Sequence, residues 1–212
     1  MDKIPRLYKH YYIDKSDERL ELFQIIAERY NIKSGLYPGS FVHITPSFVI
    51  PEMVYIDMDK RCPKFFQSGE TLSFIEKQKK YEEPASVTFF SADFTSTIDE
   101  KEESFDLLIS LYSGFVSEYC LKYIRNNGIV LANNSHGDAP LAFLNNRLDL
   151  VAAAKRRGDH FILSEKEPDS YFHTKSGKKL DKEEIKKTMK GAAYTKTAYA
   201  YIFRKQVRHG DV

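Results

Sequence analysis

The stretch Met53-Val54-Tyr55-Ile56-Asp57-Met58-Asp59 decides how the rest of the chain is interpreted. A short apolar run that is closed by a carboxylate is typical of a strand buried on both faces and followed by a loop. We therefore predict a buried strand over residues 53–57, with Asp57 at its carboxyl end.

Further short apolar runs lie on both sides of this strand. We predict strands at 35–37, 86–90, 105–111, 128–132, 161–164 and 198–203, and helical stretches at 16–30, 60–81, 115–126 and 139–157. Strands that alternate with helices favour a parallel sheet covered by helices. The last two strands have no helix-length apolar segment between them, which predicts an antiparallel end. We expect an α/β fold with a Rossmann-like sheet of seven strands, mostly parallel with an antiparallel last strand, and helices on both faces.

The length of 212 residues corresponds to about one domain. We predict a single domain over 1–212 that begins with an N-terminal helical segment, residues 1–30. A lysine-rich insertion, residues 165–197, is expected between the last two strands.

Composition excludes several classes of protein. Hydrophobic residues make up 42% and charged residues 29% of the chain, which excludes wholesale disorder. Cys62 and Cys120 are too few for a disulfide framework. The N-terminus lacks the apolar region of a secretory signal, and the longest apolar runs are far shorter than the roughly 20 residues of a membrane span. We expect a cytoplasmic protein with no membrane partner.

Charge is distributed unevenly along the chain. Residues 1–150 carry 17 Lys and Arg against 22 Asp and Glu, a net charge of −5, and residues 151–212 carry 15 against 8, a net charge of +7. The basic C-terminal third suits a nucleic acid or another anion, and a solvated surface is the alternative interpretation.

Polar residues follow the predicted strands at their carboxyl ends. The segments are Tyr37-Pro38-Gly39-Ser40, Asp57-Met58-Asp59, Ala92-Asp93-Phe94, Leu111-Tyr112-Ser113-Gly114 and Asn133 to Asp138. In open α/β sheets, ligands bind at this edge. We therefore expect the functional site to be made from these five segments.

Four of these patterns resemble the class I S-adenosylmethionine-dependent methyltransferases, over roughly residues 17–205. Residues 35–41 stand where that family has its glycine-rich loop, 53–59 look like its second strand with a ribose-binding acid, 90–94 like its third-strand motif, and 105–110 like its fourth strand. The resemblance implies S-adenosylmethionine as cofactor, with Asp57 on the ribose and Asp93 with Phe94 on the adenine. The implied cofactor-binding residues are Tyr37, Gly39, Ser40, Asp57, Met58, Asp93, Phe94 and Leu111.

The first loop departs from the family pattern. One glycine of the usual three remains, at Gly39, and Tyr37 replaces the acidic residue. Phe41 and His43 add bulk where the backbone normally approaches the methionine part of the cofactor. A protein with the methyltransferase fold that has lost the cofactor and works as a binding protein is therefore an alternative.

The densest polar cluster is Asn133 to Asp138. His136 is the candidate general base, and Asp138 is expected to orient it. The alternative is that Asp138 caps the helix that begins at Ala139-Pro140. The predicted substrate-binding residues are Tyr112, Asn133, Asn134 and Tyr194.

Several other chemistries lack their motifs. HExxH, CxxC, the phosphate-binding GxxxxGK[ST] and GxSxG do not occur, so we predict no metal site, phosphoryl transfer or acyl transfer. The function that we expect is methyl transfer from S-adenosylmethionine to a small polar or anionic acceptor. The open alternatives are the binding protein described above and a nucleic-acid-binding variant.

Overall fold

The fold is described from a computed structural model, which covers residues 4–158 and 160–207. The chain divides into two compact units, residues 1–98 and 99–212, and each is described by itself. The predicted single domain over 1–212 stays a prediction, and its ends, 1–3 and 208–212, lie outside the described residues.

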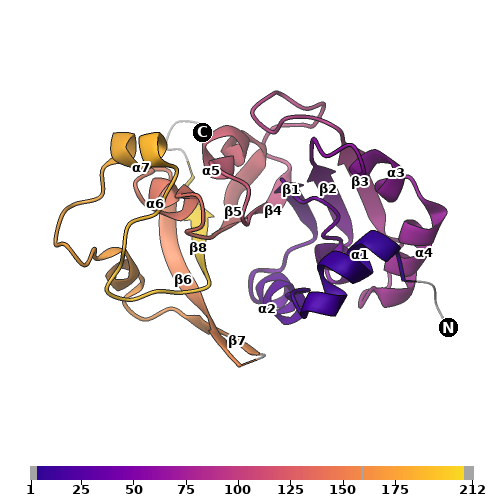
Figure 1. The fold of residues 1–212 in the computed structure, drawn as a ribbon, viewed down its shortest axis with the longest axis horizontal. Coiled ribbons are helices and arrows are strands. Elements are labelled where there is room, and N and C mark those ends of the chain that lie inside the picture. The colour runs from indigo at the N-terminus through magenta and orange to yellow at the C-terminus, as the bar shows by residue number, and fades with distance from the viewer. Residues whose placement is uncertain (1–3, 159, 208–212) are drawn as a thin grey trace. The chain divides into compact units, whose positions relative to one another are not determined.

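The first unit, indigo to magenta in Figure 1, is built on three parallel strands. The predicted N-terminal helical segment contains α1 (Arg6–Tyr11), η1 (Ile13–Lys15) and α2 (Leu20–Tyr30). The remaining elements are β1 (Ser34–Pro38), η2 (Thr45–Phe48), β2 (Glu52–Ile56), α3 (Cys62–Phe66), α4 (Gly69–Gln78) and β3 (Ser86–Phe90). β2 pairs in parallel with β1 on one side and with β3 on the other. The three carboxyl ends therefore lie at one edge.

Local sequence explains these elements. α2 buries Leu22, Phe23, Ile26 and Ala27, which recur at the spacing of one helix face. The helical stretch predicted over 60–81 is divided into α3 and α4, and the Ser68 side chain accepts from the backbone N–H of Glu70 at the start of α4.

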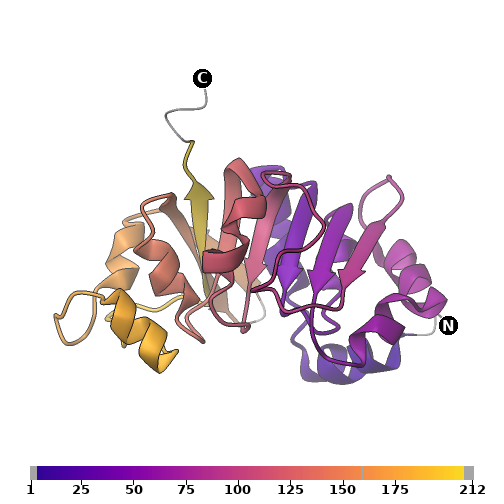
Figure 2. The ribbon, with the colours of Figure 1, turned by 90° about the horizontal axis from the view of Figure 1, so that it is seen from above.

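The described residues of the second unit form five strands. Its elements are β4 (Phe105–Ser110), α5 (Val116–Cys120), η3 (Leu121–Tyr123), β5 (Ile124–Ala132), α6 (Asp138–Phe143), β6 (Leu148–Arg157), β7 (His160–Ser164), η4 (Pro168–Phe172), α7 (Lys182–Thr188) and β8 (Ala200–Lys205). β4 and β5 are parallel, and the order continues β5-β8-β6-β7 with antiparallel neighbours. Helices pack against the strands of each unit (Figure 2).

The prediction of a helix over 139–157 is wrong. It is the short helix α6 followed by the long strand β6, which lies between β8 and β7. Ala152, Ala153 and Ala154 favour a helix by intrinsic propensity, but here they are fully buried in the sheet. Pairing on both sides outweighs a preference of a few tenths of a kcal/mol per residue.

The predicted fold class is confirmed as α/β and Rossmann-like, with an antiparallel last strand. The described residues form eight strands where seven were predicted, and β6 is the additional one. The helix predicted over 115–126 is shorter than expected, because β5 already begins at Ile124.

Candidate cofactor and substrate site

The turn after β1 and the carboxylate after β2 are in direct contact. Gly39 has a φ of 65° and its N–H donates to the carbonyl of Ile56 at 2.7 Å. Glycine adopts this left-handed conformation without strain. Two residues later, the N–H of Phe41 donates to Oδ2 of Asp57 at 2.7 Å. The structure therefore brings together Gly39, Ser40 and Asp57, as the sequence predicts.

Asp57 uses both carboxylate oxygens locally. Oδ1 accepts from the N–H of Asp59 at 2.8 Å, in addition to the bond between Oδ2 and Phe41. A carboxylate has about four acceptor positions, so two remain for hydroxyl groups of a ligand. Met58, between the two aspartates, is 68% exposed, which is unusual for a large apolar side chain.

Asp93 and Phe94 follow β3 at the same edge. The N–H of Asp57 donates to the carbonyl of Phe90, the last residue of β3, at 3.2 Å, which places the two loops side by side. Oδ1 of Asp93 accepts from the N–H of Thr95 at 2.9 Å, and the pKa of Asp93 is lowered because of this bond. Asp93 therefore presents an ionised carboxylate.

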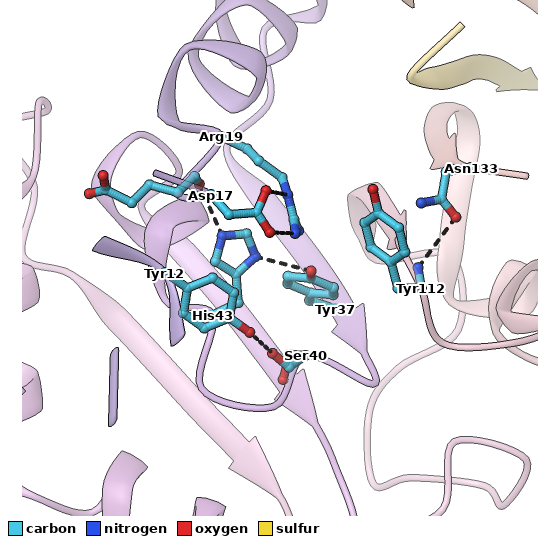
Figure 3. A network of polar contacts seen from close by, with 9 residues as sticks. Tyr12, Asp17, Arg19, Tyr37, Ser40, His43, Tyr112 and Asn133 are labelled. Atoms are coloured by element: carbon cyan, nitrogen blue, oxygen red, sulfur yellow. Dashed lines mark hydrogen bonds and ion pairs between the residues drawn. The ribbon is translucent and has the colours of Figure 1, made fainter. Parts of the chain in front are cut away.

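Tyr37 and His43 belong to a buried polar network of the first unit (Figure 3). The Tyr37 hydroxyl lies 3.1 Å from Nδ1 of His43, and Nε2 of His43 lies 3.0 Å from the carbonyl of Glu18. A carbonyl only accepts, so Nε2 carries the proton and Nδ1 accepts from Tyr37. Burial, followed by the charge of Arg19, holds the pKa of His43 well below its ordinary value. Both side chains are committed to this network.

The ring of Phe41 lies against the N-terminal helix. Its centroid is 4.9 Å from that of Tyr11, and the guanidinium of Arg61 lies 4.5 Å from it. Phe41 has a φ of 47°, an uncommon conformation for a bulky residue. The ring is half-buried and is held by Tyr11 and Arg61.

In the second unit, Tyr112 and Asn133 join the ends of β4 and β5. The N–H of Tyr112 donates to Oδ1 of Asn133 at 3.3 Å (Figure 3). Tyr112 has a φ of 64° and is 48% exposed, so its ring is presented to solvent. Leu111, predicted to contact the cofactor, has a side chain only 1% exposed and is a core residue.

Asn133 also orients His136 through Ser135. Oδ1 of Asn133 accepts from the Ser135 hydroxyl at 3.1 Å, and that hydroxyl lies 2.9 Å from Nδ1 of His136. Since the Ser135 proton is donated to Asn133, Nδ1 of His136 must carry the proton of the second bond. The lone pair of the neutral imidazole is therefore on Nε2, the form that a general base requires.

The predicted pairing of Asp138 with His136 is wrong. Asp138 is 2% exposed, and its carboxylate accepts from the Ser110 hydroxyl at 2.5 Å and the Ser117 hydroxyl at 2.7 Å. It also accepts from the N–H of Ser117 at 3.0 Å, so it caps α5 rather than its own helix. Burial raises the pKa of Asp138 to about 6. Short-range sequence gives no signal for a cap supplied by a distant residue.

Asn134 and Tyr194 are brought together by the segment before β8. The side chain of Asn134 packs on Gly191, where an added Cβ would lie 1.6 Å from Oδ1, and its Nδ2 donates to the carbonyl of Ala192 at 3.5 Å. Tyr194 is 2% exposed, and burial raises its pKa. Its ring packs edge-on against Phe172 and belongs to the core of this unit.

Sequence reasoning missed Ser110, Ser117 and Ser135. Ser110 is the last residue of β4 and Ser117 is the second residue of α5, and both hydroxyls donate to Asp138. Ser135 could have been predicted from the sequence, because it lies between the candidate residues Asn133 and His136 in the same turn.

Comparisons with known proteins give similarity in structure only. No protein-family model matches the chain, and no curated protein matches it in sequence. Among solved structures, the tRNA (m1A58) methyltransferase TrmI from Aquifex aeolicus is similar over 89% of this chain and 69% of its own, with 15% identity and a TM-score of 0.46. The N-methyltransferase NodS from Bradyrhizobium japonicum matches 95% of this chain and 91% of its own, with 11% identity and a TM-score of 0.48.

An O-methyltransferase from Bacillus cereus is also similar, over 68% of this chain and 77% of its own, with 13% identity and a TM-score of 0.48. All three of these solved structures are named as methyltransferases. At these identities the similarity assigns no residue and no substrate.

Two further kinds of feature, a membrane-spanning helix and a metal-binding cluster, do not occur in the described residues. Within 4–158 and 160–207, no helix combines the length and apolarity needed to cross a bilayer. Over the same residues, no three His, Cys, Asp or Glu side chains gather in a way that would hold a metal ion.

Proposed function

We propose that this chain is an S-adenosylmethionine-dependent methyltransferase that acts on a small polar or anionic acceptor in the cytoplasm. The observation that carries the proposal is the edge of the first unit, where the left-handed turn at Gly39 is bonded to Asp57 and Asp93 follows the adjacent strand. These groups stand in the order in which an adenosine is bound in open α/β sheets.

The residues of this edge fit the adenosine part of the cofactor. The two remaining acceptor positions of Asp57 suit the vicinal hydroxyls of a ribose. Exposed Met58 and the ring of Phe94 suit the faces of adenine, and the ionised Asp93 suits its exocyclic amine. Bound S-adenosylmethionine would supply a methyl group activated by its sulfonium charge. The protein's own task is then mainly positioning.

The acceptor is deprotonated, in this proposal, by Nε2 of His136. The chain Asn133–Ser135–His136 fixes the tautomer that leaves this nitrogen basic. Tyr112, with its exposed ring, and the amide of Asn134 remain the proposed substrate contacts. Tyr194 is proposed to act indirectly, by supporting the segment that packs on Asn134.

The test is calorimetric titration of S-adenosylhomocysteine into Asp57→Asn and into a matched variant, Glu52→Gln. Glu52 is an exposed acid at the opposite end of the same strand. Loss of a matched polar partner costs about 1–3 kcal/mol, so Asp57→Asn should bind at least fivefold more weakly. Glu52→Gln should bind like the natural protein. Equal affinity in all three proteins would contradict the role of Asp57.

A second variant, Phe41→Gly, separates the enzyme from the binding protein that has lost the cofactor. Because the ring is held by Tyr11 and Arg61, we expect the natural protein to bind and the variant to bind within about threefold of it. Tight binding that appears only in Phe41→Gly would mean that the natural loop is occluded. The methyltransferase proposal would then be abandoned. The nucleic-acid-binding alternative stays a prediction.

A further inference from the structure

A second polar cluster lies in the second unit, away from the residues discussed so far. We call it the Tyr171 cluster: Lys155 of β6, Ser164 at the end of β7, Ser170 and Tyr171 of η4, and Lys196 in the segment that leads into β8. Figure 1 shows the β6–β7 hairpin from which Lys155 and Ser164 come. Neither the adenosine edge nor the His136 turn uses any of these residues.

The centre of the cluster is a buried phenol. Tyr171 is 0% exposed, its ring packs edge-on against Tyr201 of β8, and its hydroxyl forms no close hydrogen bond with any described residue, although Lys155 and Ser164 lie near enough to lower its pKa. A buried hydroxyl without a partner costs about 1–3 kcal/mol, so native structures rarely keep one unless a ligand or another group satisfies it.

Two ammonium groups lie next to this phenol. Nζ of Lys196 is 4.1 Å from the centroid of the Tyr171 ring and Nζ of Lys155 is 5.4 Å from it. Lys196 also donates to the Ser170 hydroxyl at 2.9 Å. Within the part of the chain that the structure describes, neither ammonium forms an ion pair with a carboxylate. The acids of the same segment, Glu165, Glu167 and Asp169, are exposed.

Positive charge at the cluster is therefore uncompensated. Burial alone raises the pKa of Tyr171, but Lys155, Ser164 and Lys196 together hold that pKa below the ordinary value of 10. Lys155 and Lys196 are half-buried, which weakens their hydration and strengthens their attraction for an anion. Two ammonium groups and neighbouring hydroxyl donors match a dianion with several oxygens.

The register of the strands places the cluster relative to the His136 turn within this unit. Ala132 at the end of β5 pairs with Tyr201 of β8, Tyr201 pairs with Ala153 of β6, and Ala153 pairs with Ser164 of β7. Three steps between neighbouring strands span about 15 Å.

We propose that Lys155, Lys196 and Tyr171 form a binding site for a phosphate group, either inorganic phosphate or the phosphate of a small phosphomonoester. The two ammonium groups neutralise the phosphate, and the Tyr171 hydroxyl donates to one of its oxygens. That the ester is the methyl acceptor rests on the function proposed above; the phosphate site itself does not.

The first test is calorimetric titration of inorganic phosphate and methyl phosphate into the full chain at fixed ionic strength, without any nucleoside. We expect both to bind, and Lys155→Met and Lys196→Met each to weaken binding at least tenfold. Lys155→Arg keeps the charge and should bind within threefold of the natural protein. Lys178→Met and Lys179→Met remove the same charge from exposed positions of the neighbouring loop and should bind within twofold.

Several outcomes would overturn the site. No phosphate binding, or equal losses in the control variants and in Lys155→Met, would leave only diffuse attraction by a basic surface. Acetate bound as tightly as phosphate would exclude the phosphate assignment. Because S-adenosylhomocysteine is absent, a failure here leaves the cofactor proposal standing, and a failure of cofactor binding leaves this site standing.

The second test follows tyrosine ionisation by absorbance at 295 nm, which is free of tryptophan signal because the chain has none. The difference between the natural protein and Tyr171→Phe isolates Tyr171. A bound anion disfavours the phenolate, so phosphate should raise the pH at which Tyr171 titrates. A Tyr171 titration that phosphate leaves unchanged would make the phenolate itself the counter-ion, and the proposal would be wrong.

Discussion

Each of the two units buries a titratable polar network around one residue, His43 or Asp138, and these two residues respond to pH in opposite directions. In the first unit, His43 is fully buried between Tyr37 and Glu18 and stays neutral. In the second, Asp138 is almost fully buried between Ser110 and Ser117. Burial disfavours the charged form in both cases.

The consequence for stability has opposite signs. The pKa of His43 is lowered on folding, so its contribution is present above the unfolded pKa of about 6.5 and is lost as the pH falls below it. The pKa of Asp138 is raised from 3.8 to about 6, so its contribution is present below pH 3.8 and is lost as the pH rises to 6. Two similarly buried titratable groups can therefore change the stability of their units in opposite directions as the pH falls.

The largest expected effect is that of His43→Phe. The change removes the hydrogen bonds of His43 with the Tyr37 hydroxyl and the Glu18 carbonyl, which should cost about 2–4 kcal/mol at pH 7. The natural first unit should lose stability as the pH falls from 7 to 5, and the variant should lose less over the same range. Hydrogen exchange of peptides from β1 and β2 measures both. Exposed His10→Gln is the control, and an unchanged acid response in His43→Phe would contradict the assignment.

Gly191→Ala should have the next largest effect, confined to the second unit. Its Cβ would meet the Asn134 amide at 1.6 Å, and such overpacking costs about 1–3 kcal/mol. Gly69→Ala in the first unit has open space around it and should be neutral or slightly stabilising. Urea denaturation followed by circular dichroism checks the pair. The double variant Gly191→Ala with Asn134→Ala should recover most of the loss; additive losses would exclude a direct clash.

The smallest effect is expected for Asp138→Asn. This variant changes the buried titratable residue of the second unit, as His43→Phe changes that of the first. An asparagine still accepts from the N–H of Ser117, but it does not titrate. The natural second unit should lose about 1 kcal/mol as the pH rises from 5 to 7, and the variant should show no such change. Hydrogen exchange of the α5 peptide at the two pH values gives the measurement. Glu118→Gln, which removes a neighbouring acid, should retain the natural response.

The sequence predicted most of the strands because each is a short apolar run that needs only its own residues to be recognised. β3 is found over the predicted residues 86–90, and β2 and β4 are each displaced by one residue at most at either end. The contact between the Gly39 turn and Asp57 followed from the rule that parallel strands end at a common edge. β6 was missed because its alanines prefer a helix until neighbouring strands pair with them.

By itself, the sequence determined the α/β class and which loops gather at the carboxyl ends of the strands, because apolar patterning and chain direction suffice for both. Only the tertiary structure decided what the polar side chains of those loops do. Asp138 caps α5, and the ammonium groups of Lys155 and Lys196 lie over the Tyr171 ring. Each of these depends on residues distant in sequence, and a hydrogen bond or an ion contact is fixed by distance in space, which local sequence does not specify.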